Sequence, residues 1–288
     1  MPDYNLKETQ TMEYKRPDVV KGYTDQTLYI NLADPQIEIK PVDEKTKKTF
    51  IGGKGYDLWL LWNAVQPSTR WNDPENALCI AAGPLGGTPI YPGSGKSIVA
   101  TLSPTTGSVM DSNVGGYFGP YLKFSGFDAL EIQGKSSKEI VVFIDGINQK
   151  VQVFEASGLP ENAYELSAIL TEHCAQGKPR NISVVSAGPG AKNTLIGCLN
   201  ITWYDPKRKR ARYKQAGRGG VGSVFADKGL KAVVACWGNV TADTNAPADK
   251  DRLKTVAKMH SREVVELDPK QNEMAKIGTT HLVTIMND

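Results

Sequence analysis

Two stretches of this 288-residue chain place small and apolar residues in the same order. GGYFGPYLKFSGFDALEIQG begins at Gly115, and GGVGSVFADKGLKAVVACWG begins at Gly219. An Ala-Gly-Pro segment precedes each stretch, and the separations from Gly83 to Gly115 and from Gly188 to Gly219 are 32 and 31 residues. Several ordered matches at an offset of about 104 residues are typical of a duplicated unit.

The duplication limits the architectures that are open to the chain. Two copies are too few for a solenoid, so we expect two units packed about a pseudo-twofold axis. The paired-glycine loops then lie near the axis, where a residue without Cβ lets the backbone approach a ligand. We expect one ligand that is itself two-fold, with one half held by each loop. The residues leave open the alternative that both loops are only tight turns.

The composition is that of a folded globular protein, with 40% hydrophobic and 23% charged residues. No run approaches the roughly 20 apolar residues of a membrane span, and the polar start lacks a signal peptide, so we expect a cytoplasmic protein without a membrane partner. A net charge of +3 is too small to indicate a nucleic-acid partner. The cysteines and histidines show no ligand spacing, so no metal site of clustered side chains is expected. They are Cys79, Cys174, Cys198, Cys236, His173, His260 and His281.

Two further motifs concern phosphate and other anions. The run KRKRARYK at 207–214 holds six basic side chains, which predicts a solvated loop or an anion bound beside it. GSGKS at 93–97 resembles the end of a P-loop, but Ile90 stands where that motif requires glycine. The β-branched residues that follow favour a strand over the helix that a P-loop needs. Lys96 remains a candidate point charge for a phosphate without that motif.

The pattern along the chain mixes short strands, glycine turns and a few helices without regular βαβ alternation. It predicts a hairpin turning at Asp34-Pro35, a buried helix after GGKG and a helix over Glu161–Cys174. Residues 241–250 are typical of a linker, and amphipathic helical spacing follows them. We therefore predict one domain over 1–240 and the start of a helical region over 241–288. Its apolar end predicts that this region continues in another polypeptide or was cut off.

Three segments carry a family resemblance. AAGPLGGT, SNVGGYFGPYLKFSGFDALEIQGK and QAGRGGVGSVFADKGLKAVV resemble, in order and spacing, the amino-terminal part of the tungsten-containing aldehyde ferredoxin oxidoreductase family. The similarity runs from about Leu28 to the last residue, and ring-reducing benzoyl-coenzyme A reductase subunits share the segments. The resemblance implies an α+β fold of two intertwined β-rich repeats about a pseudo-twofold axis, followed by the start of an α-helical domain.

The resemblance also implies the cofactor. In this family, the domain is the base for a tungsten ion held by the dithiolene sulfurs of two pyranopterins, so the protein need not supply tungsten ligands. A magnesium ion (Mg2+) bound through backbone carbonyls bridges the terminal phosphates of the pterins.

Site residues follow by position in the matching segments. Asn113 and Gln215 would supply the two magnesium-binding carbonyls, and Lys96 falls where the family commonly has an arginine near a phosphate. We expect valine at Gly115 or Gly219 to abolish tungsten retention while the protein stays folded. The residues implied around the two pterins are Val114, Gly115 and Gly116 for one, and Lys214, Ala216, Gly217, Arg218 and Gly219 for the other.

The family's 4Fe-4S cluster ligands and proton-handling residues lie downstream of the matched region, so catalytic residues are unknown in this chain. The implied partners are a C-terminal half or subunit that carries the cluster, ferredoxin or another electron carrier, and a small aldehyde. The leading hypothesis is the cofactor-binding part of an enzyme that oxidises an aldehyde and water to a carboxylate. The alternatives are a non-catalytic scaffold or assembly subunit, and a ring-reducing benzoyl-CoA reductase-type subunit.

Overall fold

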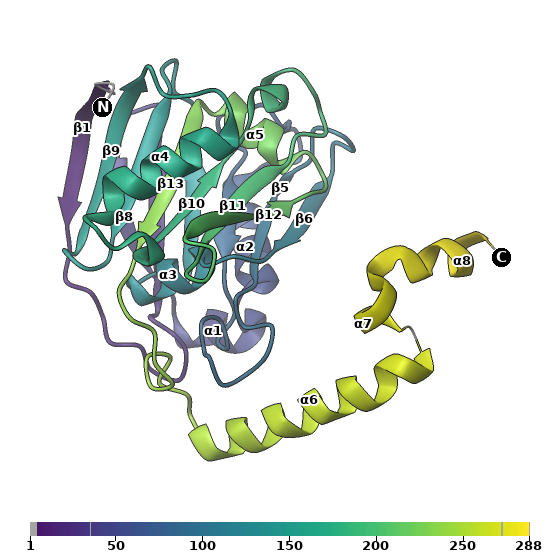
Figure 1. Cartoon of the computed structure of the whole chain (residues 1–288). Coiled ribbons are helices and arrows are strands. Elements are labelled where there is room, and N and C mark those ends of the chain that lie inside the picture. Colours follow the sequence, from purple (N-terminus) through teal and green to yellow (C-terminus); the bar gives the residue numbers. More distant parts are fainter. Residues whose placement is uncertain (1–4, 35, 272, 288) are drawn as a thin grey trace.

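The computed structural model describes residues 5–34, 36–271 and 273–287 (Figure 1). Within these residues, two mixed sheets pack against each other, and helices cover their outer faces. The six-stranded sheet has the order β3-β2-β7-β4-β5-β6, and the seven-stranded sheet has the order β1-β9-β8-β13-β10-β11-β12. The fold is therefore a mixed α/β arrangement, with both parallel and antiparallel strand pairs in each sheet.

The strands and helices have the following bounds. The six-stranded sheet contains β2 (Gln26–Asn31), β3 (Gln36–Pro41), β4 (Leu78–Ala81), β5 (Ser97–Leu102), β6 (Val109–Val114) and β7 (Ala129–Gln133). The other sheet contains β1 (Asn5–Glu13), β8 (Ile140–Asp145), β9 (Lys150–Ser157), β10 (Ile182–Ser186), β11 (Leu199–Asp205), β12 (Arg210–Ala216) and β13 (Leu230–Cys236). The α-helices are α1 (Glu44–Phe50), α2 (Lys54–Ala64), α3 (Phe118–Phe124), α4 (Ala163–Ala175), α5 (Val221–Asp227), α6 (Lys250–Gln271), α7 (Met274–Ile277) and α8 (Leu282–Asn287), and the 3₁₀ turns are η1 (Pro179–Asn181), η2 (Pro189–Lys192) and η3 (Gly278–His281).

The two sheets share one connectivity. Strand for strand, β3-β2-β7-β4-β5-β6 corresponds to β9-β8-β13-β10-β11-β12, and β2 pairs with β7 in parallel as β8 pairs with β13. We call residues 26–133 the first unit and residues 140–236 the second unit. This shared connectivity agrees with the repeated sequence, whereas the pseudo-twofold axis itself stays a prediction.

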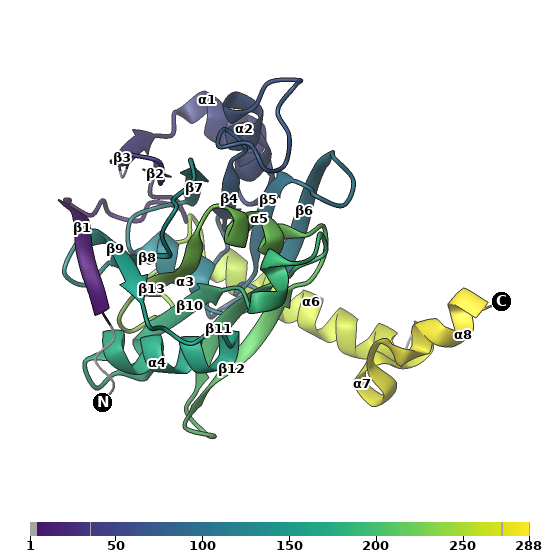
Figure 2. The same cartoon turned by 90° about the horizontal axis from the view of Figure 1, so that it is seen from above.

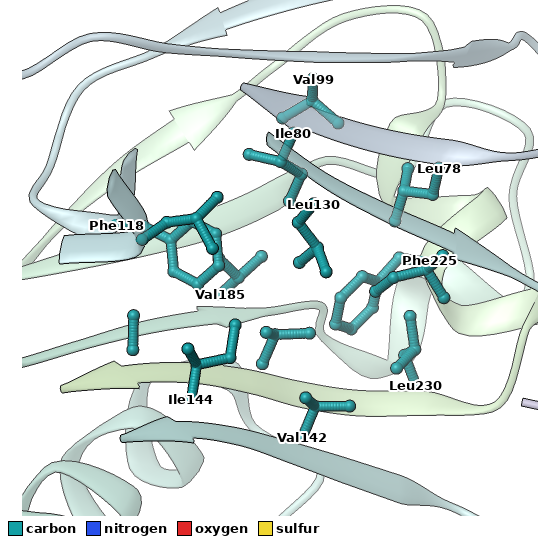
Figure 3. Close-up of a cluster of buried hydrophobic side chains, with 14 of the residues drawn as sticks. Leu78, Ile80, Val99, Phe118, Leu130, Val142, Ile144, Val185, Phe225 and Leu230 are labelled. Atoms are coloured by element: carbon teal, nitrogen blue, oxygen red, sulfur yellow. The ribbon is translucent and has the colours of Figure 1, made fainter. Parts of the chain in front are cut away.

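The core lies between the sheets. Figure 3 shows apolar side chains of β4, β5 and β7 facing those of β8, β10 and β13, with Phe118 and Phe225 between them. Both phenylalanines are fully buried and come from α3 and α5, the helices that follow the two paired-glycine segments. On the outer faces, α2 packs on β4 and α4 packs on β10 (Figure 2). Both units thus contribute one strand layer and one inner helix to a common core.

A glycine inside each inner helix sets how closely that helix approaches its own sheet. A Cβ atom on Gly119 of α3 would lie 2.2 Å from Oγ of Ser97, and one on Gly222 of α5 would lie 2.3 Å from the Cys198 carbonyl oxygen. Ser97 begins β5, and Cys198 directly precedes β11. Glycine is therefore required at Gly222, where a side chain would meet backbone, whereas a side chain at Gly119 would have to displace the Ser97 hydroxyl. Each helix thus rests on the start of the inner strand of its hairpin.

Several sequence predictions are confirmed. The hairpin appears as β2 and β3, although Pro35 of its turn lies outside the described residues. The helix after GGKG is α2, the second predicted helix is α4, and the amphipathic spacing beyond residue 250 forms α6. The predicted solvated loop at 207–214 is confirmed for 207–209, which form an exposed turn, and is wrong for 210–214, which pair with β11 as part of β12. Pairing with a neighbouring strand stabilises this segment even though its side chains are polar.

Helices α6 to α8 project from the body of the molecule (Figures 1 and 2). Ala257 of α6 is buried, and Nδ1 of His260 lies 2.5 Å from the hydroxyl oxygen of Tyr91. Many apolar side chains of these helices are exposed, including Val264 and Val265. Over the described part of the chain, no helix has the length and apolar character needed to cross a membrane.

A buried lysine connects α3 to the Ala-Gly-Pro segment of the first unit. The ammonium group of Lys123 donates hydrogen bonds to the carbonyl oxygens of Gly83 and Gly86. Its side chain is fully buried, and burial lowers the pKa of Lys123 from 10.5 to about 8. The charge therefore opposes folding, although its hydrogen bonds satisfy two backbone carbonyls.

We expect the stability of the natural protein relative to a Lys123→Met variant to rise as the pH rises from about 8 to 10.5. Over this range, the unfolded chain binds the proton that the folded chain releases, so deprotonation favours the folded state. Chemical denaturation at both pH values measures the difference. Lys48→Met, which removes an exposed lysine of α1, should show no such change. A Lys123→Met difference that stays constant with pH would contradict the lowered pKa.

Candidate functional site

The candidate site lies where the edge hairpins of the two sheets end. In the first unit, β5 and β6 pair so that Val114 faces Ser97, and in the second, β11 and β12 pair so that Ala216 faces Leu199. Both pairs join the last residue of the outer strand to the first residue of the inner strand. We call residues 115–117 the first glycine loop and residues 217–220 the second glycine loop.

The strand register decides which residues of the two loops correspond. Asn113 and Gln215 occupy the same position, one residue before the end of the outer strand. The next glycines in register are Gly115 and Gly217, at an offset of 102 residues. The paired glycines of the sequence align Gly115 with Gly219, which is two residues out of this register. The second loop is the longer of the two before its helix begins.

The first glycine loop rests on the second unit. A Cβ atom on Gly115 would lie 3.4 Å from Cγ of Lys214, and one on Gly116 would lie 2.8 Å from Cγ2 of Ile201. The backbone N–H of Tyr117 donates to the carbonyl oxygen of Thr202 across 3.4 Å. Gly116 also has a φ of +108°, so both its conformation and its contact require glycine.

The second glycine loop rests on the first unit in return. Nε of Arg218 donates to the backbone carbonyl of Asp111 across 2.8 Å, and its terminal nitrogen lies 3.0 Å from the carboxylate of Asp111. A Cβ atom on Gly219 would lie 2.0 Å from Cγ of Met110. The loops therefore cross: the first is held by the β11–β12 hairpin and the second by β6. We call this contact the crossing.

The crossing is rich in positive charge. The carboxylate of Asp111 lies 2.8 Å from Nζ of Lys54 and also pairs with Arg218. The hydrogen bond from Lys54, followed by that from Arg218, holds the pKa of Asp111 below its usual range although partial burial opposes the shift. The side chain of Lys214 lies over Gly115. Lys96 directly follows Gly95, and a Cβ atom on Gly95 would lie 3.1 Å from the carbonyl oxygen of Gly116. A site where cationic side chains lie beside closely approaching backbone segments is suited to a phosphate-bearing ligand.

The glycines of the crossing differ in whether their φ angle or a close contact requires glycine. Among the described residues, no heavy atom beyond its chain neighbours lies within 4 Å of a Cβ position on Gly217, and its φ is not left-handed. Gly115 also has an ordinary φ and an ordinary contact distance. Packing of the protein itself thus explains Gly116 and Gly219 but leaves Gly115 and Gly217 unexplained. These two positions form a cradle that side chains would fill, which fits a bound ligand.

Valine at Gly219 does not isolate ligand binding, so that part of the sequence expectation is corrected. Gly219 has a φ of +71°, and its Cβ would collide with Met110. A side chain there would strain the backbone and separate the two units. Valine at Gly115 remains a usable test.

The remaining candidates are distributed around the crossing. The side chain of Gln215 donates to Oδ1 of Asn200 across 3.1 Å, and Asn113 is exposed on β6. Val114 and Ala216 are buried at the ends of their strands, so they anchor the loops. Over the described residues, no group of three or more His, Cys, Asp or Glu side chains could hold a metal ion.

Sequence reasoning missed two residues of the site. Lys54 stands in the GGKG turn at the start of α2, and Asp111 stands two residues before Asn113. Their positions beside recognised motifs were a usable signal, but their pairing with Arg218 depends on the crossing of the units. A cavity of about 330 Å³ beside Tyr117, with Tyr121 and Arg180 in its wall, was also not predicted.

Comparisons with known proteins show the family to which the chain belongs. The family model described as "Aldehyde ferredoxin oxidoreductase, N-terminal domain" matches residues 27–236. The chain is 32% identical over 260 residues to the tungsten-containing aldehyde ferredoxin oxidoreductase of Pyrococcus furiosus. This alignment covers 90% of this chain and 40% of that protein. It is 27% identical to the WOR-like subunit of an aliphatic sulfonate oxidoreductase of the same organism, over 85% of this chain and 39% of that protein.

A solved structure of the active-site complex BamBC of benzoyl coenzyme A reductase with 1,5-dienoyl-CoA has a TM-score of 0.72 and 29% sequence identity. The match covers 88% of this chain and 35% of that chain. The chain thus spans about two fifths of the length of the curated relatives. Because the family model matches most of the chain, this protein belongs to the aldehyde ferredoxin oxidoreductase family and contains its N-terminal domain.

Proposed function

We propose that this chain is the cofactor-binding part of a tungsten-dependent aldehyde:ferredoxin oxidoreductase. The observation that carries the proposal is the crossing of two glycine loops in matching register, beside Lys54, Lys214 and Arg218. The names of the Pyrococcus relatives support tungsten as the metal. The dehydrogenation of an aldehyde with water to a carboxylate, a cytoplasmic location and transfer of electrons to ferredoxin belong to this proposal.

The residues present fit a bis-pyranopterin cofactor. Gly115 and Gly217 would each face one pterin, because neither glycine is required by its φ or by a close contact within the protein. The backbone carbonyls of Asn113 and Gln215, which match in register, would bind the magnesium ion that the family resemblance implies. Lys96 and Lys214 would hold the phosphates as point charges. The remaining candidates for cofactor contact are Val114, Gly116, Ala216, Arg218 and Gly219.

When bound, the cofactor supplies the two-electron redox chemistry of the reaction. The chain's own contribution is binding and orientation. The contacts of Gly116 with Ile201 and of Gly219 with Met110 keep the loops at a constant separation. Asp111 directs the Arg218 guanidinium across the crossing and leaves Lys54 partly neutralised beside it. The 4Fe-4S cluster and the substrate pocket are proposed for the rest of the enzyme, beyond the two fifths that this chain spans.

A ring-reducing role is the second candidate, because the solved structure with a TM-score of 0.72 is that of a benzoyl coenzyme A reductase complex. The two candidates share the cofactor cradle and differ in the substrate.

Gly115→Val and Gly217→Val should each reduce tungsten and pterin per chain to near background while the circular dichroism spectrum stays unchanged. The added side chains would fill the cradle without a collision at their own Cβ positions. The matched control is Gly190→Val in η2, a glycine with ordinary φ and no contact within 4 Å in the described part of the chain. Full tungsten occupancy in both loop variants would mean that the glycines serve only as turns.

Arg218→Gln and Asp111→Asn should lower tungsten retention by about half or more, because a loosely held loop loses the geometry of its site. The free energy of unfolding should fall by less than ~1 kcal/mol, since the Arg218 side chain is largely exposed. Metal analysis and denaturation of the same samples separate the two effects. Glu155→Gln, which breaks the exposed ion pair with Lys138, is the control. Unchanged tungsten in both site variants would exclude a positioning role.

The complete enzyme should reduce a ferredoxin or a dye with small aldehydes as electron donors and should not reduce aromatic coenzyme A thioesters. Both substrate classes are to be assayed with the same preparation at equal tungsten content. Thioester reduction without aldehyde oxidation would contradict the aldehyde oxidoreductase function and favour the ring-reducing role.

A further inference from the structure

The inner face of the β11–β12 hairpin is basic and leads to the first glycine loop. Residues that face each other in an antiparallel pair point to the same side of the sheet, and side chains alternate along a strand. Lys214, Arg212 and Arg210 face Ile201, Trp203 and Asp205 in register, so all six side chains share one face. Ile201 and Lys214 contact the first glycine loop, which shows that this face is turned toward the crossing.

This hairpin concentrates the positive charge of the chain. Residues 207–214 hold six of the 34 lysines and arginines and no acidic residue, so without them the net charge would change from +3 to −3. Asp205 lies 2.8 Å from a terminal nitrogen of Arg208 and 3.7 Å from one of Arg212. One carboxylate therefore compensates only part of the charge, and the arginine side chains remain about half exposed.

Aromatic rings connect the basic face to a cavity. The guanidinium of Arg212 lies 5.8 Å from the ring centre of Trp203, and that ring lies 6.1 Å from the ring of Tyr117. Tyr117 is 40% exposed and also lines the cavity of about 330 Å³, together with Tyr121 and Arg180. A cavity with two tyrosines and one arginine in its wall is suited to a small molecule.

We propose that this place is a binding site for an organic phosphate that carries a planar ring. Arg210 and Arg212 would bind the phosphate groups, and the ring would stack against Tyr117 in the cavity. The site is adjacent to the cradle: it shares the first glycine loop through Tyr117 but uses neither Gly115 nor Gly217. The occupant is a small molecule, since Tyr117, which contacts Trp203 of the basic face, also lines a cavity of about 330 Å³.

Calorimetric titration of the purified full chain with ADP, pyrophosphate and adenosine tests the site. ADP should bind with about tenfold or higher affinity than pyrophosphate, because only ADP adds a stacked base, and than adenosine, which lacks the phosphates. Arg210→Gln combined with Arg212→Gln should weaken ADP binding by about tenfold or more. Tyr117→Ala should weaken it, and Tyr117→Phe should restore it, because phenylalanine keeps the ring.

The matched control removes two positive charges elsewhere, through Lys45→Gln and Lys48→Gln on the exposed side of α1. An equal loss of ADP affinity in this control and in the hairpin variant would overturn the site in favour of non-specific attraction. No saturable ADP binding, or equal affinity for ADP and pyrophosphate, would overturn it as well. Tungsten content is measured on the same samples. Loss of the proposed cofactor function would therefore be distinguished from loss of this binding site.

Discussion

Each glycine loop is held by the outer strand or hairpin of the other unit, and the candidate site depends on this reciprocal contact. Gly116 packs on Ile201 of the second unit, and Gly219 packs on Met110 of the first. Neither loop could keep its conformation if the units separated, because the groups that support it belong to the other half of the sequence. A site made in this way comes into existence only when both units are folded and packed.

The inner helices make the crossing possible. Gly119 and Gly222 allow α3 and α5 to lie directly on the starts of β5 and β11, which brings the loop before each helix to the edge of its sheet. The crossing is not symmetric in charge, however. Arg218 reaches across to Asp111, which also pairs with Lys54. In the second unit, Tyr213 of β12 stands at the place that corresponds to Asp111. The two halves of a two-fold ligand would therefore meet similar backbones and different side chains.

Much of the fold could be predicted from the sequence because its strands are apolar and its glycines mark turns. Strand β6, VMDSNV, could not be predicted from its pattern, since its stability comes from pairing with β5 and from the crossing. The basic strand β12 was missed for the same reason. The repeated glycines led to the correct loops, but only the strand register identified Gly217 as the counterpart of Gly115. The partnership of Asp111 with Arg218 joins residues 107 positions apart, which no local pattern indicates.

The central claim is that the two loops together hold one two-fold cofactor. Quantifying tungsten, magnesium and pterin per chain in the natively purified enzyme tests it most directly. We predict one tungsten ion and two pterins for each copy of this chain. A single pterin per chain, or the absence of both tungsten and molybdenum from active and intact enzyme, would contradict a cofactor shared between Gly115 and Gly217.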